Sequence, residues 1–160
     1  GDVMGATWAE IDLHKSIWTI LAYRMKVSKE HRVPLPEKAV TLLRGMQDTT
    51  VSEFVFPGAQ PNRPLSNMAF LQLIKRMGRG GLTAHGFRST FRDWVAERTI
   101  HSSEVAEMAL AHAVSDKVEA AYRRGDLFDK RRKMMDAWAD YCGTVHEGSE
   151  GNVMPFKGAS

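Results

Sequence analysis

The sequence predicts a mainly α-helical domain with a small antiparallel β-sheet near its N-terminus, an α+β arrangement. Short runs rich in β-branched and aromatic residues are confined to the first 36 residues, and such runs are typical of strands. From there onward, apolar residues recur at helical spacing between capping residues and glycine stops. The length of 160 residues is sufficient for one domain with its own core.

Three segments are expected to form the sheet. TWAEIDL at 7–13 alternates apolar and polar residues, SIWTILAYR follows at 16–24, and HRVPLP forms a third run at 31–36. The stretch MKVSKEH at 25–31 is expected to turn the chain between the last two strands. The sheet is therefore predicted to be antiparallel.

Two helices are expected before residue 82. Pro36 stands where the first turn of a helix tolerates proline, ahead of Val40 and Leu43. A loop rich in Pro, Ser and Asn follows at 48–66. Ser66 is then expected to cap a second helix. Its apolar positions are Phe70, Leu71, Ile74 and Met77, and glycines end it at Gly78, Gly80 and Gly81.

The stretch LTAHGFRSTFRDW at 82–94 is predicted to form a helix capped by Thr83. His85 and Arg88 are three residues apart, so their side chains can converge on one ligand, and Arg92 falls on the same stripe. The adjoining stripe is apolar and is expected to be the core face. Its members are Phe87, Phe91, Trp94 and Val95.

Three further helices complete the prediction. Ser102 or Ser103 caps one that ends near LAH at 110–112, and Ser115 caps DKVEAAY at 116–122, which Gly125 stops. Asp126 is expected to cap the last helix, whose apolar face is Leu127, Arg131 (through its stem only), Met134, Met135, Trp138 and Tyr141. The domain is placed at 1–143, and residues 144–160 are expected to form a poorly ordered or extended tail.

Composition narrows the class of protein. The net charge of +3 and the pI of about 9.1 are compatible with a polyanionic partner without requiring one. The single cysteine, Cys142, excludes an internal disulfide and a Cys-rich zinc site, which fits a reducing, cytoplasmic setting. No signal peptide and no membrane-length apolar run is visible. The chain opens with GDVMGATW rather than an initiator methionine, so we expect a fragment or a processed domain.

A few polar residues point to chemistry. Taken singly, His85, Arg88 and His112 are most simply packed or solvated side chains. Together, a guanidinium fork suited to phosphate or carboxylate and a neighbouring imidazole able to move a proton favour an anion site. A metal site is disfavoured because the histidines show no HxxxH or HxH spacing and Arg88 would repel a cation. Neither G-x-S-x-G nor G-x-x-x-x-G-K-[ST] occurs, so no metal, cofactor or ATP is expected.

These motifs resemble those of the tyrosine recombinase catalytic domain, specifically that of phage and genomic-island integrases. HGFRSTFRDW looks like the family's H-x-x-R box, LAH its second histidine motif, and AAYRRGD its nucleophile motif. YRMKVSKEHRVPLP is similar to the hairpin that bears a catalytic lysine, and KRRKMMDAWADYCG to the C-terminal helix. The resemblance extends from Gly1 to about Gly143.

The resemblance implies site-specific DNA recombination through a 3′-phosphotyrosyl intermediate. It makes Tyr122 the nucleophile, Arg88 the residue that binds the non-bridging oxygens, and His85 the group that exchanges a proton near the tyrosine. His112 would donate a hydrogen bond to the phosphate. Lys26 would protonate the leaving 5′-oxygen, with Lys29 as the weaker candidate. Contacts to the DNA backbone are expected from Arg92, Arg123, Arg124, Lys75 and Arg76, although each equally fits a solvated surface. The implied partners are double-stranded attachment-site DNA and a synaptic tetramer, in the nucleoid-associated cytoplasm of a bacterium.

One departure from the family pattern matters. Another catalytic arginine belongs to a segment similar to R-S-G-[DE]-V, and this chain begins GDVMGATW, just past that position. We therefore expect the chain to fold but to be impaired in recombination. Two alternatives stay open: a DNA-binding relic that cuts nothing, and a type IB topoisomerase, which shares the chemistry.

Overall fold

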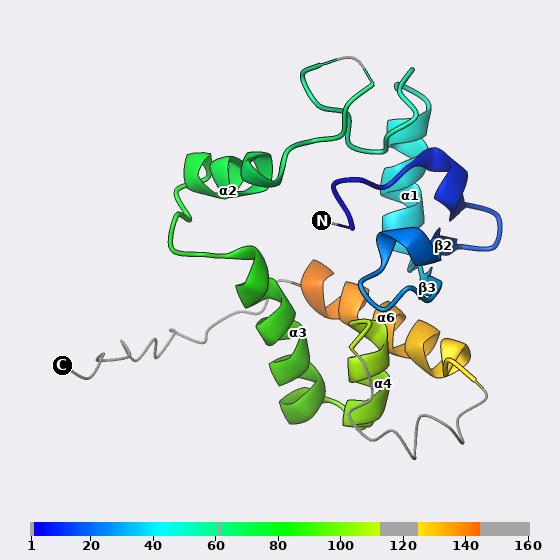
Figure 1. Cartoon of the computed structure of the whole chain (residues 1–160). Coiled ribbons are helices and arrows are strands. Elements are labelled where there is room, and N and C mark those ends of the chain that lie inside the picture. Colours follow the sequence, from blue (N-terminus) through cyan, green and yellow to red (C-terminus); the bar gives the residue numbers. More distant parts are fainter. Residues whose placement is uncertain (1, 61, 113–124, 145–160) are drawn as a thin grey trace.

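A computed structural model describes residues 2–60, 62–112 and 125–144 (Figure 1). The elements along the chain are η1 (Trp8–Glu10), β1 (Ile11–Asp12), β2 (Ile17–Ile20), η2 (Ala22–Arg24), β3 (His31–Pro34), α1 (Glu37–Gln47), α2 (Asn67–Arg76), α3 (Ala84–Arg98), α4 (Ser103–Ala109) and α6 (Phe128–Gly143). The predicted α+β fold is confirmed. The helix expected at 116–122 and the tail after residue 144 lie outside the described residues.

The sheet is three-stranded and antiparallel in the order β1-β2-β3, as predicted. Trp18 of the central strand pairs with Ile11 on one side and Val33 on the other. Two parts of the expected strands are instead short 3₁₀ helices, η1 and η2. The buried carboxylate of Glu10, in η1, accepts hydrogen bonds from Trp18 Nε1 at 3.1 Å and from the guanidinium of Arg24, in η2, and so connects the two.

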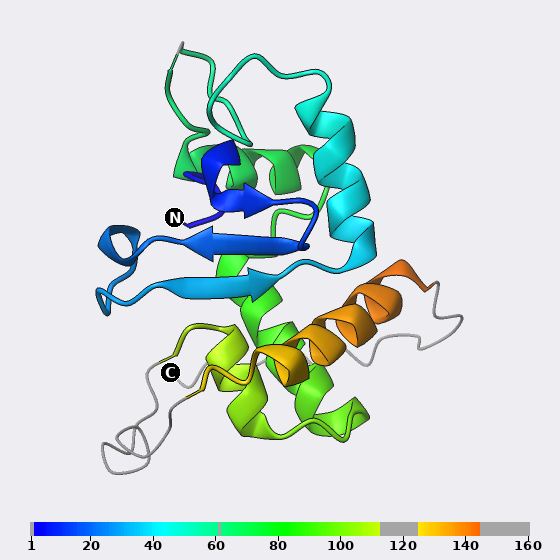
Figure 2. The same cartoon turned by 90° about the vertical axis from the view of Figure 1, so that its right-hand side faces the viewer.

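Helix α6 joins the two parts of the molecule. The sheet and α1 form one part, and α3, α4 and α6 pack together below them in Figures 1 and 2. Helix α6 contacts β3, α1 and α4. The N-terminal sheet is thereby fixed against the helices that carry the H-x-x-R box and His112.

The core lies between α3, α4 and α6. Its buried members are Phe91, Trp94, Val95, Val105, Ala106 and Met134. Trp138 of α6 packs against α3, with ring centroids 5.0 Å from Trp94 and 5.4 Å from Phe91. The prediction for Phe91, Trp94 and Val95 is confirmed. The prediction for Phe87 is wrong, because its side chain is 50% exposed and packs edge-on against Phe70 of α2 rather than into this core.

Helix α2 forms where predicted, with Ser66 as its N-cap residue and Gly78 beyond its end at φ 72°. Of the expected apolar positions only Ile74 is buried, whereas Leu71 and Met77 are exposed. The sequence pattern identified the helix correctly but overstated how much of it is covered.

Arg131 departs most from prediction. Its side chain is 1% exposed, so the guanidinium is buried along with the stem. It donates to the Asp126 carboxylate at 2.9 Å, to the Asp126 carbonyl at 2.8 Å and to the Arg32 carbonyl of β3 at 2.7 Å. A buried charge is tolerated when its donors are paired in this way. Asp126 therefore does not serve as the predicted cap, and Leu127, at φ 52°, is the N-cap residue of α6.

The Asp126 carboxylate is held in its charged form. Partial burial acts to raise its pKa, but Arg32 and Arg131 outweigh that effect and bring the pKa below its usual value. Arg32 donates to the same carboxylate oxygen at 2.9 Å. Since the folded pKa is lowered, the stabilisation is present above the ordinary value of about 4 and is lost as pH falls through the lowered pKa.

Replacing Arg131 tests this interaction. Arg131→Met should reduce the free energy of unfolding at pH 7 by about 3 kcal/mol, because the carbonyls of Asp126 and Arg32 and the Asp126 carboxylate all lose this donor. Lys133→Met, at an exposed position on the same helix, is the matched control and should have little effect. Urea unfolding measures both, and the gap between Arg131→Met and wild type should narrow as pH is lowered below about 4. Equal stability of the two variants would contradict the assignment.

Candidate active site

The C-terminal end of α4 folds back on itself. Ala111 adopts the left-handed conformation at φ 54°. The amide of His112 donates to the Glu107 carbonyl at 3.0 Å, and the amide of Ala111 donates to the Met108 carbonyl at 3.2 Å. This pair of hydrogen bonds is the Schellman motif of a helix end. It places His112 against the last turn of α4.

The imidazole of His112 contacts a carboxylate of α4. His112 Nδ1 hydrogen-bonds one oxygen of Glu107, and the other oxygen forms an ion pair with Arg92 Nη2 of α3 at 2.7 Å. No sequence pattern marked Glu107, because a separation of five residues does not pair side chains on a regular helix. The left-handed residue creates the contact, and alanine gives no sequence signal for it.

Arg88 reaches the same turn from α3. Its half-buried guanidinium donates to the carbonyl of Leu110, two residues before His112. Arg88 and His112 are thus anchored to one short segment, 107–112. His85 lies one turn earlier on α3 with an exposed side chain, and the predicted cap of that helix is confirmed because the Thr83 hydroxyl accepts from the Gly86 amide at 3.0 Å.

His31 contacts this segment from the sheet. It is half-buried at the start of β3. Burial lowers the pKa of His31, the charge of Arg131 lowers it further, and the backbone of Ala109 acts in the opposite direction. The neutral ring is therefore favoured. No sequence signal marked His31, since its partner is remote along the chain.

The remaining expected site residues are more exposed or undescribed. Lys26 and Lys29 are exposed in the turn between β2 and β3, which Figures 1 and 2 show on the same side of the molecule as the C-terminal end of α4. Lys75 and Arg76 are exposed in the last turn of α2. Tyr122, Arg123 and Arg124 lie outside the described residues.

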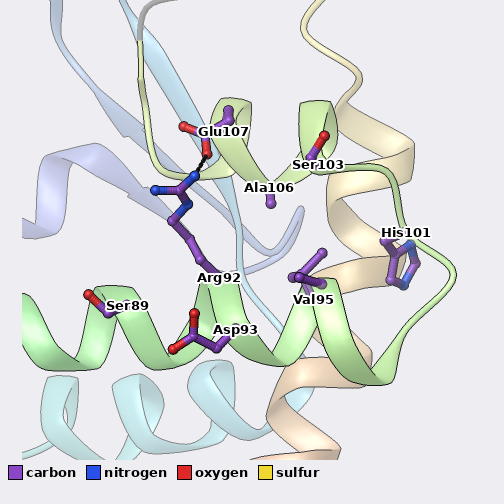
Figure 3. Close-up of a pocket in the computed structure, with 9 residues that line it drawn as sticks. Ser89, Arg92, Asp93, Val95, His101, Ser103, Ala106 and Glu107 are labelled. Atoms are coloured by element: carbon purple, nitrogen blue, oxygen red, sulfur yellow. Dashed lines mark ion pairs between the residues drawn. The ribbon is translucent and has the colours of Figure 1, made fainter.

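A groove lies beside the Arg92–Glu107 ion pair, between α3 and α4 (Figure 3). Its volume is about 540 Å³ and its polar lining includes Ser89, Asp93, His101 and Ser103. Within the described ranges, no group of three or more His, Cys, Asp or Glu residues is placed to hold a metal ion. None of the helices in those ranges is long and apolar enough to cross a membrane.

Comparison with known proteins gives consistent matches. A model of the phage integrase family matches residues 1–127. Prophage integrase IntA of Escherichia coli (strain K12) is 39% identical over 147 residues, which are 90% of this chain and 35% of IntA. Prophage integrase IntS of the same strain and the integrase of Shigella phage Sf6 are each 38% identical over 138 residues, or 84% of this chain and 36% of theirs. The chain thus spans about a third of these relatives' length. No solved structure matches significantly.

The left-handed residue at the end of α4 gives a stability prediction. Ala111→Gly should raise the free energy of unfolding by roughly 0.5 to 1 kcal/mol, because it relieves a left-handed alanine while adding some freedom to the unfolded chain. Ala109→Gly, the same change inside α4, should instead lower stability by about 0.5 to 1 kcal/mol. Urea unfolding of both variants checks the signs, and a loss of stability in Ala111→Gly would refute the terminal turn.

Proposed function

The chain belongs to the phage integrase family, and from that membership we propose that it is the catalytic domain of a tyrosine-type site-specific DNA recombinase. The reaction cleaves and rejoins DNA strands through a 3′-phosphotyrosyl intermediate. The observation that carries the proposal is the shared anchoring of Arg88 and His112 at the end of α4. Two phosphate-binding side chains held by one turn suit a single scissile phosphate.

Arg88 is oriented for such a role. A guanidinium carries five N–H donors in a planar fork, so one hydrogen bond to Leu110 orients the group and the remaining donors can bind the non-bridging oxygens. His112 supplies a further donor. These groups stabilise the negative charge that gathers on the phosphoryl oxygens in the transition state, and they need no metal to do so.

Tyr122 is the proposed nucleophile. Its phenol oxygen attacks phosphorus, a new P–O bond forms, and the bond from phosphorus to the 5′-oxygen breaks. A free phenol has a pKa near 10, so His85 is proposed to accept its proton and nearby cations to favour the phenolate. Lys26, or less favourably Lys29, protonates the leaving 5′-oxygen. Attack by a 5′-hydroxyl on the phosphotyrosine reverses these steps and reseals DNA without ATP.

The proposed partner is double-stranded attachment-site DNA. Backbone contacts are assigned to Arg92, Lys75 and Arg76 among the described residues, and to Arg123 and Arg124. Such contacts position a protein on DNA without reading its sequence. Residues 1–143 form the catalytic domain in this proposal, which acts within a synaptic tetramer on the nucleoid of a bacterial cytoplasm.

Two alternatives remain to be tested. In the main alternative, these 160 residues bind DNA but cleave it poorly, because they do not include the further arginine of the family pattern. The other is a topoisomerase-like activity, since rotation of the cut strand between cleavage and resealing uses the same intermediate. The short interval from LAH to AAY favours recombination.

Covalent capture tests the nucleophile. Incubated with a nicked suicide substrate that carries an attachment site, the protein should form a denaturation-resistant DNA adduct. Tyr122→Phe should abolish the adduct while leaving the dissociation constant for DNA unchanged, because only the attacking oxygen is removed. Gel electrophoresis under denaturing conditions measures the adduct. Tyr23→Phe, at an exposed tyrosine, is the matched control and should capture DNA as wild type does.

The assay is run on the 160 residues and on their fusion behind the amino-terminal remainder of IntA. Stronger capture by the fusion is expected if the impaired alternative holds, and equal capture refutes it. Persistent capture by Tyr122→Phe would exclude Tyr122 as the nucleophile. Relaxation of supercoiled plasmid without site preference would favour the topoisomerase.

Salt dependence tests the backbone contacts on α2. Replacing Lys75 and Arg76 together by Ala should weaken DNA binding about equally for all sequences and reduce the slope of log K against log salt by about 2, since each phosphate contact contributes roughly one. Fluorescence anisotropy across a salt series measures the slope. Arg44→Ala on α1, outside the proposed contact set, should leave it unchanged. An unaltered slope in the double variant would remove both residues from the interface.

A further inference from the structure

The carboxylate of Glu107 connects Arg92 and His112, which have separate roles in the proposed function. One oxygen forms an ion pair with Arg92 at 2.7 Å and the other is hydrogen-bonded to His112 Nδ1. The Glu107 side chain is 30% exposed and that of His112 is 39% exposed. The contact is therefore partly shielded from water. Glu107 and Arg92 line the groove between α3 and α4 (Figure 3).

We propose that Glu107 is a positioning residue, which holds His112 with Nδ1 towards itself and Nε2 towards the scissile phosphate, and that Arg92 fixes Glu107 for this task. The inference rests on the proposed function for its catalytic consequence. Its geometric part concerns the free protein and can be tested without DNA.

The chemistry of the two partners determines the tautomer. An ionised carboxylate only accepts hydrogen bonds, so His112 Nδ1 must carry a hydrogen. The hydrogen bond at one ring nitrogen specifies the role of the other, and Nε2 lies on the opposite side of the ring from Nδ1. Among the described residues, the hydrogen bond of the His112 ring involves Nδ1. Nε2 can donate to a phosphate only if it also carries a hydrogen, so in the proposed site the ring held between Glu107 and the phosphate is the imidazolium.

Two restraints act on His112 together. The Schellman turn fixes its backbone through the Glu107 carbonyl, and the Glu107 carboxylate fixes its ring. Arg92 belongs to α3, one turn after Arg88, so the Arg92–Glu107 ion pair also fixes α4 relative to the helix that carries the arginine. Such restraint keeps reacting groups in productive geometry before substrate arrives.

The geometric part is tested by ¹⁵N chemical shifts of the imidazole nitrogens in the 160-residue protein, with His112 identified by the signal lost in His112→Ala. Wild type should show hydrogen on Nδ1 at neutral pH. Glu107→Ala should move His112 towards the Nε2–H tautomer, and Glu107→Gln should keep Nδ1–H, because the amide oxygen still accepts. Glu97→Ala, at an exposed position on α3, is the control and should change nothing.

The catalytic part is tested by the rate of covalent capture at saturating DNA. Glu107→Ala should slow capture by roughly ten- to hundredfold, the range seen when the partner that orients a functional histidine is removed, with Glu107→Gln intermediate. DNA affinity and the thermal midpoint should stay near wild type. In a His112→Ala background, Glu107→Ala should cause no further loss, because its effect passes through His112.

Each outcome has a distinct meaning. Nε2–H in wild type, or a tautomer unchanged in Glu107→Ala, would overturn the positioning proposal. An additive loss in the His112→Ala background would also overturn it, since Glu107 would then act elsewhere. A tautomer that shifts as expected in a protein that never captures DNA would support the Glu107–His112 coupling and refute the proposed function.

Discussion

The buried guanidinium of Arg131 is the interaction on which the rest of the structure depends. It joins the start of α6, through Asp126, to the backbone of β3 at Arg32. Helix α6 then contacts β3, α1 and α4, and its Met134 and Trp138 pack into the core with α3. An unpaired charge could not be buried there. The sheet and the helices are therefore held in the arrangement in which the Arg131 guanidinium keeps its acceptors on Asp126 and Arg32.

The last turn of α4 depends on that arrangement. The carbonyl groups at a helix C-terminus lack partners within the helix and carry partial negative charge. Here the Leu110 carbonyl accepts from Arg88, the backbone of Ala109 acts on the ring of His31, and His112 binds the side chain of Glu107. The end of α4 thus holds Arg88 and His112, both residues of the proposed phosphate site, at one turn.

Local patterns predicted the elements well. Alternation and β-branching located the three strands, and capping residues located the helices, including the Thr83 cap of α3. The motif resemblance, confirmed by the family match, selected His85, Arg88, His112, Lys26 and Tyr122 as site residues, and their roles stay predictions. The sequence did not reveal Glu107 or His31, because neither contact follows a helical or strand period.

Sequence alone therefore determined the class of fold and the family, and it supplied the residues of the proposed site, since these depend on periodicity and on motifs read along the chain. Tertiary structure decided that Phe87 is half exposed, that the Arg131 charge is buried, and that Ala111 turns His112 onto Glu107. The physical reason is that burial and ion pairing depend on groups brought together by packing. Helical spacing places a side chain on a face, and only the packed neighbours decide what that face meets.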